Sequence, residues 1–377
     1  MLTKKRILIS YDYFLPAFKA GGPIQSIANM VRALHAYYDF YIITSDKDLV
    51  SNSPLVGIQI DKWTEFEDGK AKVIYLSAES QGFWHLREII KFIKPDVIFL
   101  NGFFSIPFTI YIGLLSGTRR ILHTRGMIHP QALAKKKIKK WVFLFLLNKL
   151  GFFDNLEFCV SDESEYSHLI QRYPKAKKTW IVSNFPKINA EVKPIEKKVG
   201  ELKMATIALI SPMKNHLKVI KALVNSSEKI KWDIYGPVKD LAYWELCKNE
   251  IKGNYLESTI TYCGELKPEL VSETIQNYHL IIQPSESENF GHSLLESLFQ
   301  GRPIITSLNT PWNNLEGRNS GFNVVVESNQ IAEAINKMLN IGQNEFDRMA
   351  LASFEYAKKA VSTEEMLIEY QKMFDNQ

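Results

Sequence analysis

Short apolar runs along the chain alternate with stretches in which apolar residues recur every three to four positions. The runs are typical of buried parallel strands, and the recurring pattern is typical of amphipathic helices. In the first half the pattern predicts strands over 6–10, 40–44, 96–100, 120–123, 157–160 and 179–183. Helices are predicted between them, over 23–36, 83–93, 105–116 and 163–172. Such alternation predicts an α/β fold with a mainly parallel sheet.

The alternation stops over residues 185–200, where Pro, Lys and Glu replace the apolar periodicity, and then begins again. In the second half we expect strands over 204–210, 231–236, 259–263, 279–283 and 303–306, with helices over 214–225 and 238–251. A chain of 377 residues is long enough for two cores. We therefore predict a domain over 1–184, a linker over 185–200, a second domain over 201–360 and a C-terminal helix over 361–377.

The stretch IIQPSESENFGHSLLESLFQGRPIITS, residues 281–307, carries the densest set of candidate functional groups. Glu288 follows a predicted strand, at the edge where open α/β sheets bind ligands. Glu296 lies seven intervening residues later, in the first turn of a helix predicted from about Ser293. Backbone N–H groups at that helix start favour an anion. They belong to Asn289, Phe290, Gly291, His292 and Ser293. Two carboxylates around an amide nest would suit a nucleotide sugar.

A purely structural interpretation of the same stretch stays open. Ser293 and Glu296 fit the capping box S-x-x-E, in which the glutamate only closes the helix start. The four apolar residues of this helix form a core stripe that needs no ligand, namely Leu294, Leu295, Leu298 and Phe299.

Six residues of this stretch follow a spacing that resembles the signature of retaining glycosyltransferases of family 4, which have the GT-B fold. They are Glu288, Phe290, Gly291, Glu296, Gly301 and Pro303. The resemblance implies two doubly wound Rossmann-like domains facing a cleft, with the C-terminal helix packing back across both. It also implies transfer of a sugar, with retention, from a UDP- or GDP-linked donor to a glycan or lipid-linked glycan acceptor. Glu288 would orient the sugar hydroxyls, and Glu296 would accept the ribose hydroxyls.

Other positions match the same family less completely. Lys214, in Ser211-Pro-Met-Lys214, and Arg125 take the places of cations that stabilise the leaving diphosphate. Where the family usually has a further arginine this chain has Leu209, so that either Arg125 or the region of Lys218 compensates, or donor binding is weaker. The resemblance also places Gly21, Gly22, Ser211 and Gly236 at the donor. Thr310-Pro311-Trp312 and Gly321 resemble bacterial members that build surface polysaccharides such as capsule, O-antigen or exopolysaccharide.

Several alternatives in chemistry remain open. Asp46-x-Asp48 matches the D-x-D by which other glycosyltransferases hold a divalent metal, although the resemblance implies that cationic side chains and amides replace a metal. A nucleotide-sugar epimerase shares the architecture, and Leu209 makes a non-catalytic binding protein plausible. An inverting transferase would need a general base, for which His123 and His129 are candidates.

Composition and charge limit the class of protein and the cellular compartment to be expected. The content of 46% hydrophobic and 23% charged residues is that of an ordinary soluble globular protein, and a net charge of +5 is too small to indicate nucleic-acid binding. Three widely separated cysteines without metal spacing indicate reduced thiols and a cytoplasmic protein. The opening MLTKKRILISYDYF is too short in apolar residues for a signal peptide, and no run reaches the length that spans a bilayer.

One basic stretch suggests contact with a membrane surface. Five lysines lie within residues 135–140, directly before the apolar and aromatic run 141–147. Such a stretch, Lys135–Lys140, would suit peripheral attachment to the cytoplasmic face of the inner membrane. A helix with solvated lysines and a packed apolar side would show the same pattern.

Overall fold

The computed structural model describes residues 4–115, 117–130, 133, 137–174, 176, 178–187, 192–224, 226 and 229–377. Contacts between Cα atoms divide the chain into two compact units. The first unit comprises Met1–Phe185 and Thr363–Gln377, and the second unit comprises Pro186–Ser362.

The first unit is built on an eight-stranded sheet with the order β3-β4-β2-β1-β5-β6-β7-β8. Every neighbouring pair is parallel except β3 with β4. The strands are β1 Lys5–Ser10, β2 Tyr38–Ser45, β3 Trp63–Phe66, β4 Ala71–Leu76, β5 Val97–Asn101, β6 Arg119–His123, β7 Glu157–Val160 and β8 Thr179–Ile181. The predicted parallel alternation is confirmed in this half, with β3 as an antiparallel edge.

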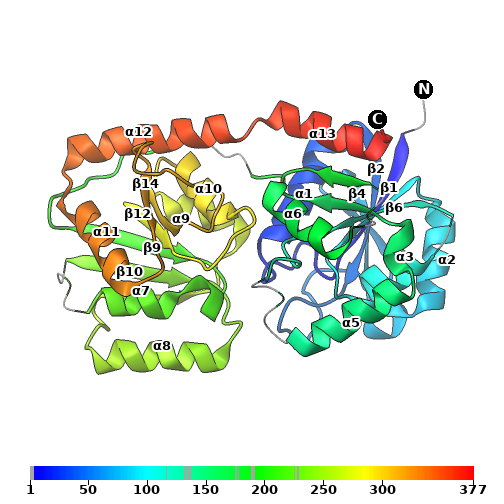
Figure 1. Ribbon diagram of the computed structural model, residues 1–377, viewed down its shortest axis with the longest axis horizontal. Coiled ribbons are helices and arrows are strands. Elements are labelled where there is room, and N and C mark those ends of the chain that lie inside the picture. The colour runs from blue at the N-terminus through cyan, green and yellow to red at the C-terminus, as the bar shows by residue number, and fades with distance from the viewer. Residues whose placement is uncertain are drawn as a thin grey trace. The chain divides into compact units, whose positions relative to one another are not determined.

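Helices cover the sheet of the first unit on its two faces (Figure 1). They are α1 Gly22–Leu34, η1 Ala78–Gln81, α2 Phe83–Ile93, η2 Ile106–Tyr111, α3 Ile112–Leu114, α5 Lys137–Lys149, η3 Phe152–Asn155, α6 Glu163–Arg172 and α13 Thr363–Asp375. Residues of α2, η2, α3, α5 and α6 share one apolar core with strand residues. The helix predicted over 105–116 is instead a π-helix followed by one short α-turn, because the N–H groups of Thr109 and Ile110 both donate to the carbonyl of Ser105.

The last helix, α13, belongs to the first unit although it follows the second unit in the chain. Its Phe374 ring packs against Tyr38 and Phe99, with centroids 5.5 and 5.6 Å away. The Tyr370 hydroxyl donates to the carbonyl of Ser183 over 3.2 Å. These contacts give the C-terminal residues a fixed place against the first sheet.

The second unit has a six-stranded, fully parallel sheet with the order β11-β10-β9-β12-β13-β14. Its strands are β9 Leu202–Ile207, β10 Ile230–Tyr235, β11 Ile260–Gly264, β12 Leu280–Gln283, β13 Ile304–Ser307 and β14 Gly321–Val324. Its helices are η4 Pro212–Lys214, α7 His216–Ala222, α8 Leu241–Gly253, η5 Pro268–Leu270, α9 Val271–Ile275, α10 His292–Phe299, α11 Ser328–Asn340 and α12 Gln343–Ala360. Numbered within the unit, the order is 3-2-1-4-5-6, the doubly wound arrangement of dinucleotide-binding folds.

Two segments differ from the pattern predicted in the second half. The helix expected over 214–225 is split into η4 and α7 at Asn215, whose backbone is left-handed (φ 56°). The described end of the expected linker, 192–200, packs on the second unit, where buried Lys197 donates from Nζ to the carbonyl of Ile341 over 3.0 Å. Composition alone did not reveal this packing, because the segment makes backbone and lysine contacts and lacks an apolar period.

Among the described residues, no helix has both the length and the apolar character needed to span a bilayer.

Candidate functional site

The strand order of the second sheet reverses between β9 and β12, which pair directly. In open α/β sheets the loops that leave the carboxyl ends of such a strand pair form the ligand site. Lys214 lies in the loop after β9, and Glu288 lies in the loop after β12. The fold therefore brings together two predicted site residues that are 74 positions apart.

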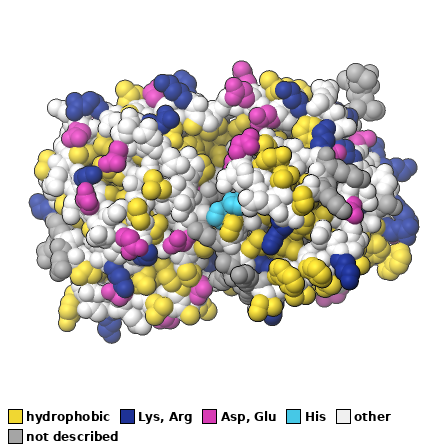
Figure 2. Space-filling view, in the orientation of Figure 1, with side chains coloured by type: hydrophobic (Ala, Val, Ile, Leu, Met, Phe, Trp, Pro, Cys, Tyr) yellow, Lys and Arg dark blue, Asp and Glu magenta, His cyan; other side chains and the backbone are white. Residues whose placement is uncertain are grey.

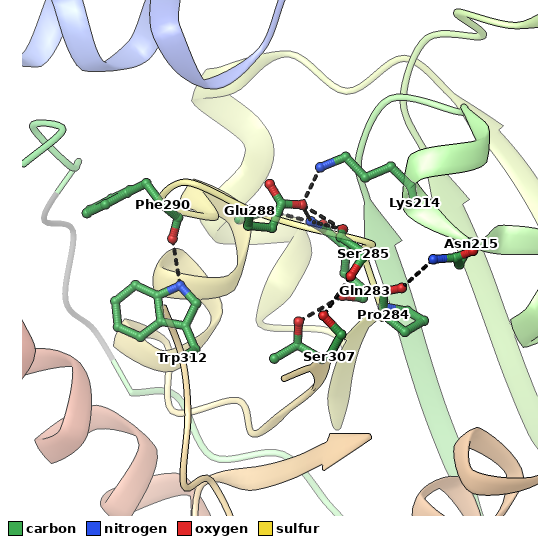
Figure 3. A network of polar contacts seen from close by, with 11 residues as sticks. Lys214, Asn215, Gln283, Pro284, Ser285, Glu288, Phe290, Ser307 and Trp312 are labelled. Carbon is green, nitrogen blue, oxygen red and sulfur yellow. Dashed lines mark hydrogen bonds and ion pairs between the residues drawn. The ribbon is translucent and has the colours of Figure 1, made fainter. Parts of the chain in front are cut away.

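Oε1 of Glu288 is the centre of a polar network (Figure 3). It accepts hydrogen bonds from Nζ of Lys214, from Nε2 of Gln283 at 2.5 Å and from Oγ of Ser285 at 2.6 Å. The side chains of Lys214 and Glu288 are only 18% and 13% exposed. Because all three donors converge on one oxygen, the second oxygen of Glu288 keeps its acceptor capacity for another partner.

The network sets the charge state of Glu288. Burial acts to raise the pKa of its carboxyl group, but the charge of Lys214 and the hydrogen bonds from Lys214, Ser285 and Gln283 outweigh it and hold the pKa below the usual value. Glu288 is therefore an ionised hydrogen-bond acceptor at neutral pH, suited to hydroxyl groups rather than to proton donation.

Hydrogen bonds hold the two loops together beneath this ion pair. Nδ2 of Asn215 donates to the carbonyl of Pro284 at 2.8 Å and to Oε1 of Glu286 at 3.0 Å. The N–H of Glu286 donates to the carbonyl of Met213 at 2.8 Å. The left-handed turn at Asn215 is thus held by the loop after β12, and this fixes the direction from which Lys214 approaches.

The N-terminus of α10 opens beside Glu288. Its N-cap is Gly291, which adopts φ 71° and whose added Cβ would lie 3.1 Å from Leu294 and 3.2 Å from Nε1 of Trp312. That indole N–H donates to the carbonyl of Phe290 over 2.7 Å (Figure 3). No side chain caps α10, and its first turn holds no acidic residue. Its first N–H groups and its dipole are thus left for an anionic ligand.

The capping-box interpretation of Ser293 and Glu296 is wrong. The helix begins one residue earlier than predicted, so Ser293 is its second residue and donates from Oγ to Oε1 of Gln283 at 3.0 Å. Glu296 is the fifth residue, beyond the first turn in which it was expected, and cannot close the helix start. The side chain of Gln283 instead joins α10 to the Glu288 network.

The Glu296 carboxylate accepts no hydrogen bond from any residue that the structure describes. Burial raises its pKa to about 7, against a smaller opposing effect of the positive charge of Lys187. A half-buried carboxylate without donors from the described protein is poised to accept hydroxyl groups from a ligand.

The other residues of the second unit that are predicted to contact the sugar donor differ in their burial and their contacts. Ser211 is buried at the start of η4. Gly236 is required by packing, because its φ is 139° and an added Cβ would lie 1.9 Å from the carbonyl oxygen of Ala208. Nδ2 of Asn289 is buried without a hydrogen-bond partner in the described chain. The ring of His292 lies 4.7 Å from that of Phe290.

Arg125, in the first unit, is enclosed in a polar network of its own. Its Nε and Nη2 donate to Oδ1 of Asn101 at 3.0 and 2.8 Å, while Nη1 donates to Oγ of Ser26 at 3.0 Å and to Oδ1 of Asn184. Only one guanidinium N–H is left over, so these contacts give Arg125 a structural role, and its predicted contact with a diphosphate stays a prediction. Lys218 likewise donates to the carbonyl of Val326.

The other candidates of the first unit are placed as follows. Gly21 caps α1 with φ 77° and open space where a Cβ would stand, and Gly22 is the first helical residue. Asp48 accepts the N–H groups of Phe18 and Lys19, as a loop carboxylate does. His123 is fully buried, and burial holds its pKa well below the usual value, which removes it as a solvent-accessible general base.

Sequence reasoning missed Gln283, Ser285 and Asn215, which position the two charged groups. A signal was present for Gln283. It stands at the end of an otherwise apolar buried strand, and a buried amide at such a place needs polar partners.

Residues 187–357 match the model of the family described as Glycosyl transferases group 1. Among solved structures, Anabaena Alr3699/HepE in complex with UDP and glucose superposes with a TM-score of 0.73 at 14% identity, covering 99% of this chain and 100% of that chain. The sucrose-phosphate synthase of Thermosynechococcus elongatus gives 0.76 at 14% identity, with 99% of both chains covered. WaaG, a glycosyltransferase involved in lipopolysaccharide biosynthesis, gives 0.65 at 13% identity, with 98% of both covered. No curated protein matches the chain significantly in sequence.

These likenesses extend over both units and confirm the predicted GT-B fold. The family match lies entirely within the second unit and contains Lys214, Glu288 and Glu296.

Proposed function

We propose that this protein is a glycosyltransferase that moves a sugar from a UDP- or GDP-linked donor to an acceptor hydroxyl. The observation that carries the proposal is the meeting of Lys214 and Glu288 at the strand-order reversal of the second sheet, beside the uncapped N-terminus of α10. A cation and free amide groups on one side and an ionised carboxylate on the other complement a diphosphate joined to a sugar.

The comparisons support the same proposal from outside the chain. The group 1 match covers the segment that contains these residues, and the fold is shared with a protein solved with UDP and glucose and with a glycosyltransferase of lipopolysaccharide biosynthesis. By analogy we also propose a role in bacterial surface polysaccharide synthesis and the retaining mechanism of family 4.

Each group has a distinct role in the proposed reaction. Lys214 and the first N–H groups of α10, from Gly291 to Ser293, stabilise the charge that builds on the leaving diphosphate, which is the largest single contribution in many enzymes. Glu288 accepts hydrogen bonds from sugar hydroxyls, and Glu296 accepts them from the ribose. Asn289 offers its unpartnered Nδ2 to the ligand. We propose that these cationic and amide groups make a divalent metal unnecessary.

A panel of UDP- and GDP-sugars tests the proposal. We expect one donor to raise the melting temperature and to release its nucleoside diphosphate faster when a hydroxyl acceptor is present, with turnover unchanged in EDTA. Conversion of the donor to its epimer without an acceptor would indicate an epimerase, and stabilisation without turnover would indicate a binding protein. NMR of the product anomer tests retention. Loss of all turnover in EDTA would restore the metal alternative at Asp46 and Asp48.

We also propose peripheral contact with an anionic membrane through α5. Of the predicted stretch, Lys135 and Lys136 lie outside the described residues, as does the side chain of Lys137. The structure supports the proposal at residues that follow: Ile138 is 79% exposed and Trp141 is 56% exposed, beside the exposed Lys139. Figure 2 shows hydrophobic and basic side chains together over this part of the first unit. Exposed aromatic residues next to lysines favour the interface of anionic lipids.

Sedimentation with vesicles tests this contact. The protein should sediment with vesicles that contain phosphatidylglycerol and should be released by high salt, whereas Trp141→Glu should stay in the supernatant. Equal sedimentation of wild type and variant would contradict the contact.

A further inference from the structure

A cavity of about 540 Å³ lies in the first unit, between the loop after β6, the first turns of α5 and the helix α6. Its volume is within the range of about 300–1,000 Å³ that is common for small-molecule sites. One wall is apolar and consists of Ile128, Leu133, Trp141 and Leu144. Ile128 and Leu144 are almost fully buried, whereas Trp141 is more than half exposed, so the apolar wall runs from the core outward to the surface.

The polar side of the cavity carries donors and positive charge. Arg172, in the last turn of α6, is exposed and forms no hydrogen bond or ion pair with any described residue. Nζ of Lys140 lies 5.2 Å from the centre of the Phe104 ring. Nδ1 of His168 is buried without a hydrogen-bond partner in the described chain. None of the described lining residues is acidic, so the cavity favours an anionic ligand.

The apolar wall continues onto the outer surface of α5. The rings of Trp141 and Phe145 stack with their centroids 5.3 Å apart, and Phe145 is 50% exposed. Leu150, just after the helix, is 80% exposed. Exposed apolar surface of this extent usually marks an interaction site. A ligand that enters along this surface can keep an apolar chain in contact with protein all the way into the cavity.

We propose that the cavity binds a lipid phosphate, with the hydrocarbon chain against Trp141 and Leu144 and the phosphate group held by Arg172. Lys140 adds a second positive charge at the rim, and the unpartnered Nδ1 of His168 completes the polar side. Ile128 belongs to the loop after β6, so the cavity reaches the carboxyl edge of the first sheet, where ligands of such sheets bind. We assign a lipid-linked glycan as the acceptor class, with its lipid phosphate in this cavity and a hydroxyl of its sugar as the acceptor atom, a step that rests on the proposed glycosyl transfer.

Calorimetric titration of the full-length protein with decyl phosphate, in the absence of any sugar donor, tests the binding site separately from catalysis. We expect one molecule to bind per chain, with octyl phosphate roughly three- to fourfold weaker for each methylene that it lacks. Inorganic phosphate should not bind measurably, and the neutral decyl maltoside should bind at least about tenfold more weakly, because one charge-assisted contact is lost.

Variants locate the site. Arg172→Ala should weaken decyl phosphate roughly tenfold, and Trp141→Ala should reduce the gain per methylene. The matched controls are Arg348→Ala and Leu351→Ala, an exposed arginine and an exposed apolar residue of the second unit. Both controls should bind as wild type does. Circular dichroism and the melting temperature confirm that each variant is folded.

Three results would overturn the proposal: inorganic phosphate that competes with decyl phosphate on equal terms, decyl maltoside that binds as tightly, or an Arg172→Ala variant with unchanged affinity. If decyl phosphate binds as predicted but a sugar linked to decyl phosphate accepts no sugar from any donor, the binding site stands and the acceptor assignment fails. If the donor panel shows no turnover at all, the proposed transfer fails and the lipid site is still judged by the titration.

Discussion

The ammonium group of Lys214 donates a hydrogen bond to Oε1 of Glu288, across the point at which the strand order of the second sheet reverses. Each of these two charges is the nearest counter-charge of the other, and both are largely withdrawn from water. A diphosphate carries more negative charge than one carboxylate and would attract Lys214 more strongly. The ion pair therefore keeps the site in order until the donor binds.

Removing the lysine separates its catalytic role from its structural one. Lys214→Met should lower kcat/KM at least about tenfold, because the leaving diphosphate loses a charge-assisted contact. It should also reduce the free energy of unfolding by roughly 1–3 kcal/mol, because Glu288 becomes a buried charge without its partner. Steady-state kinetics and urea unfolding measure the two effects.

The double variant Lys214→Met/Glu288→Gln supplies the control. It has no uncompensated charge, so its stability should return to within about 1 kcal/mol of wild type while its activity stays low. Recovery of activity together with stability would show that the pair is only structural.

Glu296 should make the stability of the protein depend on pH. Its pKa is about 7 in the folded protein, against an ordinary value of 4.5, so the folded state binds more protons between these values. Wild type should therefore lose stability as pH rises from about 4.5 through 7, and Glu296→Gln should not, with a difference of roughly 1–3 kcal/mol at pH 8. Denaturant unfolding at pH 5 and pH 8 measures this.

The same variant tests the role of Glu296 in binding. Glu296→Gln should raise the KM for the donor, because an amide is a weaker acceptor for the ribose hydroxyls than a carboxylate. A variant that gains stability at pH 8 and keeps its donor kinetics would leave Glu296 without the proposed contact.

The N-terminus of α10 depends on glycine at position 291. Gly291→Ala should reduce the free energy of unfolding by about 1–2 kcal/mol, because the left-handed backbone disfavours a side chain and the added Cβ crowds Leu294 and Trp312. Donor affinity should fall with it, since the amide groups of the first turn shift. Gly342→Ala is the matched control: this N-cap of α12 has φ −95° and an added Cβ would be 3.6 Å from Val199. Equal effects of the two substitutions would contradict this account.

Arg125→Met should act on stability rather than on the donor. The change leaves Oδ1 of Asn101 without a donor and removes one of the two donors to Oγ of Ser26 and to Oδ1 of Asn184, and this should reduce the free energy of unfolding by roughly 1–3 kcal/mol. The KM for the donor should change little in protein that remains folded. A variant of normal stability with a strongly raised KM would restore Arg125 as a ligand of the diphosphate.

The sequence predicted the fold and the two charged centres because each depends on a local pattern. Alternating strand and helix periods predicted the two parallel sheets, and a strand followed by Glu288 and by a helix with Gly291 indicated where the proposed anion site would lie. The start of α10 was misjudged by one residue, because Ser293 resembles an N-cap although its hydroxyl is used by Gln283.

What the sequence could not supply were the contacts between distant segments. The pairing of Asn215 with the loop at Pro284 joins residues 69 positions apart, and the enclosure of Arg125 by Asn184 joins residues 59 apart. Such contacts follow from the register of neighbouring strands, which no local pattern encodes. The local sequence around an arginine in a loop after a strand is therefore the same whether that arginine binds a ligand or holds its own unit together.

Calorimetric titration of the protein with UDP and with GDP tests the central claim most directly, namely that the second unit binds a nucleoside diphosphate at Lys214. We predict that one of the two nucleotides binds with a stoichiometry of one, that Lys214→Met weakens it at least about tenfold, and that Lys221→Met, which removes an exposed lysine of α7, has no effect. Failure of both nucleotides to bind, or equal affinity in the two lysine variants, would contradict the account.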